Sequence, residues 1–228
     1  MQNAQIYHQH FTEKLINDLA NHGYAICNDF LLPETVTSLA DEAGRRYLAG
    51  DMAQANTGQH AKTFNTNIRG DHIFWLNETA ESSVENTPNN MHKNVLENTS
   101  IRTYLNQMHT LKDALNQHLF MNLHEIETHL AVYPIGSYYA KHLDQFSQGE
   151  GFQKRQLSSV LYLNHNWRLD DGGALRLHLS DSQYIDIAPT AGKLVLFLSP
   201  QFWHEVLPAK RLRASLTGWF KTRLNTMI

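Results

Sequence analysis

The chain has 228 residues, of which 42% are hydrophobic and 18% charged, and its formal net charge is −3. This length suits one globular domain with a sizeable core, and the composition excludes a disordered or fibrous chain. The weak negative charge gives no reason to expect a nucleic-acid partner, and no apolar run reaches the ~18 residues of a membrane span.

The N-terminal region is predicted to contain two helices and a strand. Residues 1–11 are polar and lack the apolar stretch of a signal peptide, so we expect a cytoplasmic protein. Apolar residues recur at helical spacing over 10–22, and a short apolar strand, 24–30, follows. Its single cysteine, Cys27, is expected to be a buried free thiol, which fits a reducing compartment. A second helix is predicted over 33–48.

The next part of the chain alternates between polar loops and regular elements. Residues 49–66 are polar and show no periodicity, which is typical of a functional or mobile loop. A strand is predicted at 68–76, a second polar loop at 77–90, and a long amphipathic helix at 95–119.

The remainder is predicted to consist of short strands. Their ranges are 126–133, 138–142, 157–163, 174–179, 184–187, 194–198 and 213–221. No regular alternation of strands and helices is present that would build a parallel sheet. We therefore predict an α+β fold, a double-stranded β-helix (jelly roll) buttressed by N-terminal helices. We expect one domain over 1–228, with a helical part at about 1–122 and the jelly-roll core at about 123–222.

A candidate metal site begins at His142 and Asp144. Side chains two residues apart on a strand point the same way, so an imidazole and a carboxylate can reach one ion. With 14 histidines in the chain, one such pair is also expected by chance, and a surface turn is the alternative. His204, at a predicted strand start, could supply a third ligand from the opposite sheet. Two imidazoles and one carboxylate suit non-haem iron(II), and a hydrolytic zinc site is the competing interpretation.

Arg213 begins an otherwise apolar strand and indicates a bound carboxylate. A buried arginine needs an anionic partner, and no acid in that strand supplies one. The dicarboxylate 2-oxoglutarate would supply it, whereas a zinc hydrolase would leave Arg213 unexplained. The alternative is that Arg213 is an exposed residue at a strand end.

These motifs, taken in order, resemble the iron(II)- and 2-oxoglutarate-dependent prolyl 4-hydroxylases of the hypoxia-inducible-factor type and their bacterial relatives. The resemblance covers roughly residues 68–220. Its most specific block is His204-Glu205-Val206-Leu207-Pro208-Ala209 followed by Arg213. Further blocks match in order at 68–75, 139–144, 161–164 and 172–177.

The resemblance implies a set of site residues. The iron ligands would be His142, Asp144 and His204. The residues that bind 2-oxoglutarate would be Tyr133, Tyr162, Arg213 and Ser215. The residues near the substrate would be Arg69, Asp71, Arg155 and Trp219. Oxygen would be the second cosubstrate, with ascorbate as an added reductant.

The resemblance also implies a substrate, a prolyl residue of another cytoplasmic protein that is hydroxylated at C4. Bacterial relatives suggest elongation factor Tu as that protein. Two alternatives remain open. The first is a 2-oxoglutarate oxygenase that hydroxylates a small molecule, and the second is a non-catalytic jelly-roll binding or sensor module.

Overall fold

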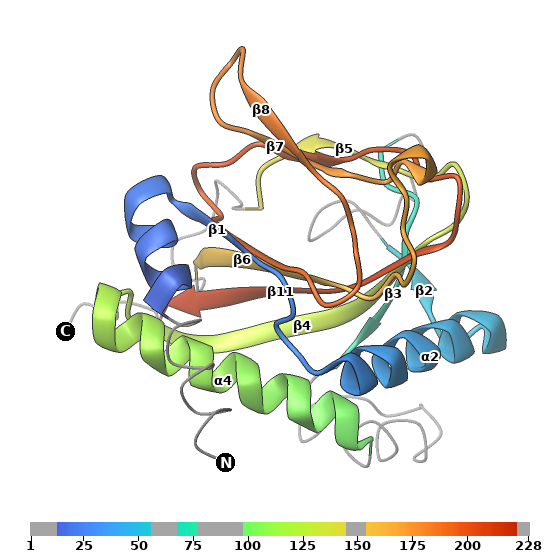
Figure 1. Ribbon diagram of the computed structural model, residues 1–228, viewed down its shortest axis with the longest axis horizontal. Helices are drawn as coiled ribbons and strands as arrows, with labels where there is room; N and C mark the ends of the chain where they lie inside the picture. The colour runs from blue at the N-terminus through green and yellow to red at the C-terminus, as the bar shows by residue number, and fades with distance from the viewer. Residues whose placement is uncertain (1–12, 56–67, 77–97, 145–153, 223–228) are drawn as a thin grey trace.

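Two antiparallel sheets face each other, and helices cover the outer side of the larger one (Figure 1). The computed structural model describes residues 13–55, 68–76, 98–144 and 154–222. Within these residues, no helix is long and apolar enough to cross a membrane.

The larger sheet has seven strands. In spatial order they are β1 (Tyr24–Cys27), β9 (Leu194–Leu198), β6 (Arg155–Tyr162), β11 (Arg213–Thr222), β4 (Leu123–Tyr133), β3 (His72–Trp75) and β2 (Ala53–Gln54). The long central strands β4 and β11 pair from Arg213 opposite Tyr133 to Thr222 opposite Leu123. Because side chains alternate along a strand, β4 directs Leu130 and Val132 into the core on the helical side. Its Tyr133 packs in a second cluster, between the sheets.

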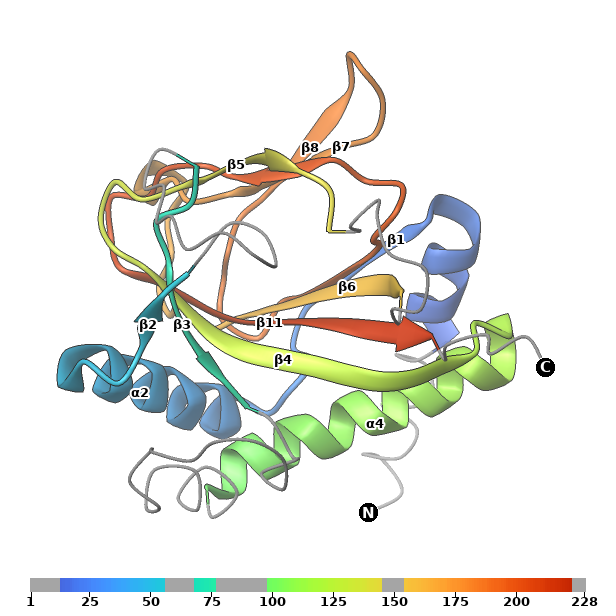
Figure 2. The same ribbon diagram turned by 180° about the vertical axis from the view of Figure 1, so that it is seen from behind.

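The helices pack against one face of this sheet. Residues 13–22 are helical, and α2 (Pro33–Ala49) and α4 (Thr99–Leu119) contact each other and strand β4 (Figure 2). The Asn98 side chain accepts hydrogen bonds from the backbone at the start of α4, and Gly50 ends α2 in the left-handed conformation. Their buried apolar residues lie at helical spacing, so amphipathic periodicity explains why these segments are helices.

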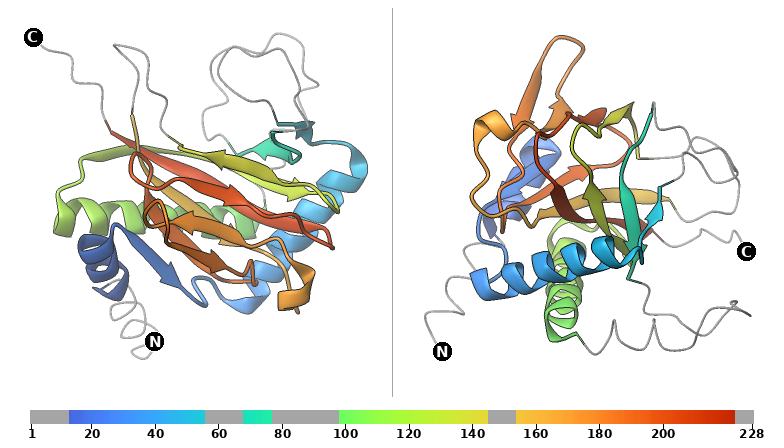
Figure 3. Two further views of the ribbon diagram at one scale, coloured as in Figure 1. Left: turned by 90° about the horizontal axis from the view of Figure 1, so that it is seen from above. Right: turned by 90° about the vertical axis from the view of Figure 1, so that its right-hand side faces the viewer.

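The smaller sheet has four strands and lies across the gap from the larger one (Figure 3). Its order is β5 (Tyr139–His142), β10 (His204–Val206), β7 (Leu175–His178) and β8 (Tyr184–Ile187), and a short 3-10 helix (Leu169–Asp171) precedes β7. Side chains from both sheets, among them Tyr162, Leu177 and Phe197, form the cluster that fills the gap. The functional pocket described below opens within this gap.

The predicted α+β jelly roll is confirmed. Helices and most strands lie within a few residues of their predicted ranges. The strand predicted at 68–76 is shorter, His72–Trp75, and two short strands, β2 and β10, were not among the predicted ranges. The loop predicted at 77–90, and most of the loop predicted at 49–66, lie outside the described residues.

Candidate active site

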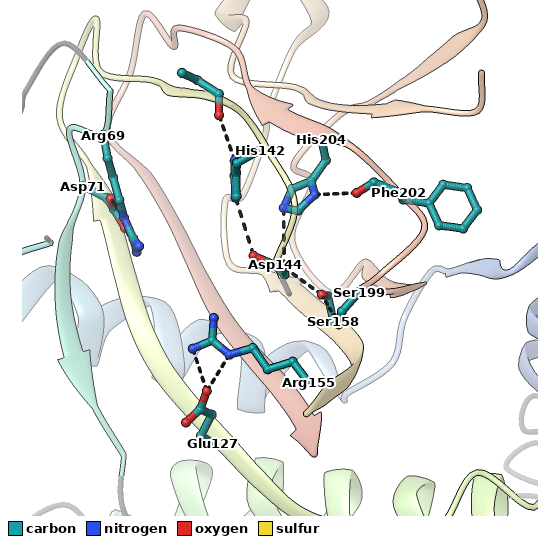
Figure 4. Close-up of polar contacts among 11 residues, drawn as sticks. Arg69, Asp71, Glu127, His142, Asp144, Arg155, Ser158, Ser199, Phe202 and His204 are labelled. Atoms are coloured by element: carbon teal, nitrogen blue, oxygen red, sulfur yellow. Dashed lines mark hydrogen bonds and ion pairs between the residues drawn. The ribbon is translucent and has the colours of Figure 1, made fainter. Parts of the chain in front are cut away.

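Three side chains from the smaller sheet converge on one point. His142 is the last residue of β5, His204 is the first residue of β10, and the two residues pair directly across these strands. Asp144 follows β5, and its two carboxylate oxygens each lie 3.5 Å from one histidine Nε2 (Figure 4). One ligand atom from each residue lies within 4.8 Å of the others, close enough for one ion. We call these residues the triad.

Backbone carbonyls orient both histidines of the triad. Nδ1 of His142 lies 2.8 Å from the carbonyl oxygen of Ala140, and Nδ1 of His204 lies 3.0 Å from that of Phe202. A carbonyl oxygen can only accept, so each Nδ1 carries the proton and donates it. Each Nε2 therefore keeps its lone pair toward the centre of the triad, which is the arrangement of a metal-binding histidine. Burial also lowers the pKa of His204 to about 4, which keeps its ring neutral.

Ser158 of strand β6 holds the triad carboxylate, and Ser199 contacts Ser158 in turn. The Ser158 hydroxyl donates to Asp144 at 2.7 Å, and the Ser158 and Ser199 hydroxyls lie 2.8 Å apart (Figure 4). Burial alone would raise the pKa of Asp144, but His204, His142 and the Ser158 hydrogen bond lower it below its ordinary value. The carboxylate is therefore ionised and available as an anionic ligand.

A pocket opens beside the triad, between the two sheets. It is lined by Arg69, Asp71, His129, Tyr133, Tyr139, His142, Asp144, Val160, Leu175, His204, Val206, Arg213, Thr217 and Trp219. The ring of Tyr139 stacks on that of His142 with centroids 3.6 Å apart, which fixes one side of the triad. Eight of the eleven residues predicted for the site line this pocket, and the apolar lining residues limit access of water.

Arg213 reaches the pocket from the larger sheet and is only 1% exposed. Its Nε donates to the Gly173 carbonyl oxygen at 2.9 Å. Its guanidinium carbon lies 5.0 Å from the ring of Tyr133 and 5.1 Å from that of Tyr162. The described part of the chain contains no carboxylate within salt-bridge distance of this guanidinium. The buried cation thus lacks a counter-ion.

The neighbours of Arg213 add a second unsatisfied group. The buried hydroxyl of Tyr162 has no hydrogen-bond partner among the described residues. Ser215, also buried, is the cross-strand partner of Tyr162, and its hydroxyl lies 3.4 Å from that of Thr217. A carboxylate would satisfy both a guanidinium that lacks a counter-ion and a phenol that lacks a hydrogen-bond partner. The residues present therefore fit a metal ion with a dicarboxylate beside it.

The residues predicted to meet the substrate fall into two groups. Arg69 binds Asp71 through two hydrogen bonds of 2.6 and 2.9 Å, and both residues line the pocket. Arg155 does not line the pocket but lies over the ring of Trp219, which does, with its guanidinium carbon 3.6 Å from the ring centroid. Glu127 accepts a 2.8 Å hydrogen bond from Arg155 (Figure 4).

Sequence reasoning missed several residues of this site. Ser158 is one of two adjacent serines in strand β6, and only the folded chain shows that it contacts Asp144. His129 lies on the same strand face as Tyr133, four residues earlier, so strand periodicity could have identified it. Thr217 shares a strand face with Arg213 and lines the same pocket.

Comparisons with known proteins agree with this geometry. The family model described as the 2OG-Fe(II) oxygenase superfamily matches residues 128–221. A solved prolyl-4-hydroxylase from Pseudomonas putida is 38% identical, with a TM-score of 0.75, and the match covers 93% of this chain and 99% of that one.

Two animal proteins are also similar. Human Egl nine homolog 1 is 27% identical over 91% of this chain, which spans 46% of the human protein's length. A prolyl hydroxylase from Trichoplax adhaerens, solved with a hypoxia-inducible-factor peptide fragment, is 24% identical, with a TM-score of 0.79 over 97% of this chain and 93% of that one, and it supports the fold alone.

Proposed function

We propose that this chain, which belongs to the 2OG-Fe(II) oxygenase superfamily, is a prolyl 4-hydroxylase that acts on a protein substrate. Iron(II), 2-oxoglutarate and oxygen are the cofactor and cosubstrates of this superfamily. We further infer that residues 1–228 form a single domain and that the protein is cytoplasmic, in keeping with its buried free cysteine, Cys27.

The observation that carries the proposal is that the buried guanidinium of Arg213 has no carboxylate partner among the described residues. A buried guanidinium without a counter-ion is strongly unfavourable, and it lies in the same pocket as two imidazoles and a carboxylate suited to iron(II). An acid that binds the metal ion at one end and carries a second carboxylate at its other end would contact both the triad and Arg213. 2-Oxoglutarate has this chemistry, and a hydrolytic metal site would need no such arginine.

Different side chains of the pocket would bind the metal ion and the cosubstrate. His142, Asp144 and His204 would hold iron(II) through Nε2 atoms and a carboxylate oxygen. Arg213 and the Tyr162 hydroxyl would bind the far carboxylate of 2-oxoglutarate, with Tyr133 and Ser215 beside it. Bound iron(II), with 2-oxoglutarate and oxygen, supplies the oxidising power that hydroxylates a C–H bond. Apolar side chains of the pocket exclude water from that chemistry.

The substrate we propose is a prolyl residue of another protein, hydroxylated at C4, with elongation factor Tu as the first candidate. Similarity to a bacterial prolyl-4-hydroxylase over nearly the whole chain supports this class of substrate. Trp219 in the pocket, with Arg155 stacked on it, and the Arg69–Asp71 pair would then contact the incoming peptide.

Succinate release from 2-oxoglutarate tests this proposal. Wild type and His142→Ala would be incubated with iron(II) and ascorbate, with and without peptides that cover each proline of elongation factor Tu. We expect peptide-stimulated release by the wild type alone, together with a mass increase of one oxygen atom on the prolyl peptide.

Other outcomes point to other functions. Turnover in the wild type without stimulation by any prolyl peptide would keep the oxygenase and replace the protein substrate by a small molecule. If no succinate formed under any condition, the chain would be a binding module, and the prolyl hydroxylase proposal would be wrong.

A further inference from the structure

The pocket wall contains a buried histidine, His129, that belongs neither to the triad nor to the residues expected to bind 2-oxoglutarate. It is 1% exposed and lines the pocket. Neither Nδ1 nor Nε2 has a hydrogen-bond partner within the described part of the chain. Buried polar side chains are nearly always hydrogen-bonded, so a ring with two unpaired nitrogens requires an explanation. A partner that enters the pocket from outside the chain would provide one.

Two tryptophans flank this histidine. The ring centroids of Trp75 and Trp219 lie 4.7 and 5.4 Å from that of His129. The indole nitrogen of Trp219 is likewise buried and without a partner among these residues. A leucine or phenylalanine would pack beside the two tryptophans without burying unpaired nitrogens. This part of the pocket therefore combines an apolar aromatic surface with unused hydrogen-bond donors.

The position of His129 on the sheet separates it from the 2-oxoglutarate end. Thr217 pairs with His129 across β4 and β11, as Arg213 pairs with Tyr133. Arg213 and Thr217 are four residues apart on one strand, roughly 13 Å along it. The far carboxylate of the cosubstrate would lie at Arg213, so the part of the pocket around His129 remains for the substrate.

The environment of His129 keeps its ring neutral. Burial lowers the pKa of His129 to about 3, and the cations Arg69 and Arg155 act in the same direction, against Asp71 and Asp144. A neutral imidazole has one N–H donor and one acceptor nitrogen. It can donate to an uncharged carbonyl oxygen without placing a charge beside an apolar ring.

We propose that His129 is a specificity-determining residue that donates a hydrogen bond to a peptide carbonyl next to the target proline. The pyrrolidine ring packs against Trp219 and is the apolar part of the occupant, and the peptide carbonyl is its acceptor. This inference rests on the proposed function, because it requires a prolyl peptide as substrate. The hydrogen bond from His129 would favour a peptide over an apolar ligand, which has no carbonyl oxygen to accept it.

Paired variants test this assignment. His129→Leu removes both ring nitrogens, His129→Gln keeps a donor, and His118→Leu changes an exposed histidine of α4 as a matched control. For each protein with iron(II), under nitrogen, the affinity for a labelled elongation factor Tu prolyl peptide and the affinity for 2-oxoglutarate are measured separately. We expect His129→Leu to weaken peptide binding about five- to tenfold and to change 2-oxoglutarate binding less than about twofold. His129→Gln should retain most of the peptide affinity.

The outcomes are distinguishable. Unchanged peptide binding by His129→Leu, or a loss confined to 2-oxoglutarate, would overturn the role of His129 alone. Failure of the wild type to bind any prolyl peptide would overturn the proposed function, and that result needs no variant. If His129→Leu does not fold, proton–nitrogen NMR of the wild-type imidazole decides the question, because the N–H proton of His129 must move downfield when a peptide carbonyl accepts from it. An N–H proton without that downfield shift on peptide addition would overturn the role of His129.

Discussion

Replacing Arg213 by methionine should separate binding of the cosubstrate from folding. Methionine retains much of the length of the side chain and removes the charge. In the complex, the change would leave a buried carboxylate without its cation, which costs roughly 3–5 kcal/mol. The affinity for 2-oxoglutarate should therefore fall roughly 100- to 4,000-fold.

The effect on the ligand-free protein should be far smaller. No carboxylate in the described part of the chain pairs with Arg213, so the variant loses the 2.9 Å hydrogen bond to Gly173 and the contacts of the guanidinium with the rings of Tyr133 and Tyr162. That bond contributes roughly 1 kcal/mol, and removal of a buried cation acts in the opposite direction. We expect the melting temperature without ligand to change by less than about 4 °C.

Thermal unfolding with increasing 2-oxoglutarate measures both effects in one assay, because a ligand that binds only the folded state raises the melting temperature. Arg211→Met is the matched control, since Arg211 is largely exposed and pairs with Asp171 at the surface. The reasoning is refuted if Arg213→Met is still stabilised by 2-oxoglutarate as the wild type is. A drop of more than about 10 °C without ligand would instead show that Arg213 serves the fold.

Three further changes test other parts of the site. Ser158→Ala removes the donor to the triad carboxylate and should weaken metal binding about 10- to 100-fold in a titration with iron(II) or manganese(II), whereas Ser159→Ala, next to it on β6, should not. The pKa of His204 falls from 6.5 to about 4 on folding, so the unfolded chain takes up the proton first. The pKa of His129 falls in the same way, to about 3. The unfolding free energy of the metal-free protein, measured in urea, should therefore fall as the pH drops from 6.5 to about 4, by up to about 1.4 kcal/mol per pH unit for each of the two histidines, and a flat profile would contradict this. Gly172→Ala places a Cβ 2.6 Å from the Pro208 carbonyl oxygen at a φ of +68°, and it should lower the unfolding free energy by more than about 2 kcal/mol; unchanged stability would show that this turn can rearrange.

Periodicity predicted the elements that are long enough to show it. The helix predicted at 33–48 and the strand predicted at 213–221 are observed at Pro33–Ala49 and Arg213–Thr222. Strand β10, His204–Val206, has too few residues for an alternating pattern, although His204 was correctly expected at a strand start. Strand β2 has only two residues and exists because β3 pairs with it. Short elements of this kind depend on tertiary pairing more than on their own sequence.

The site was predictable where its chemistry depends on local spacing. His142 and Asp144 lie two residues apart, so their convergence follows from strand geometry. The contact of Ser158 with Asp144 joins two sheets and is visible only in the folded chain. The two unpaired nitrogens of His129 depend on burial by neighbours from other strands, which no pattern within one strand reports.

The two sheets contribute different parts of the site, which links cosubstrate binding to the spacing between them. His142 and His204 are neighbours within the smaller sheet, so strand pairing fixes their separation. Arg213 belongs to the larger sheet, and its distance from the triad depends on how the sheets pack. A cosubstrate that reaches from an ion at the triad to Arg213 would hold both sheets at one separation. Its binding should therefore protect the central strands β4 and β11 from hydrogen exchange, and protection confined to surface loops would show that the two sheets are already held rigidly by their own core.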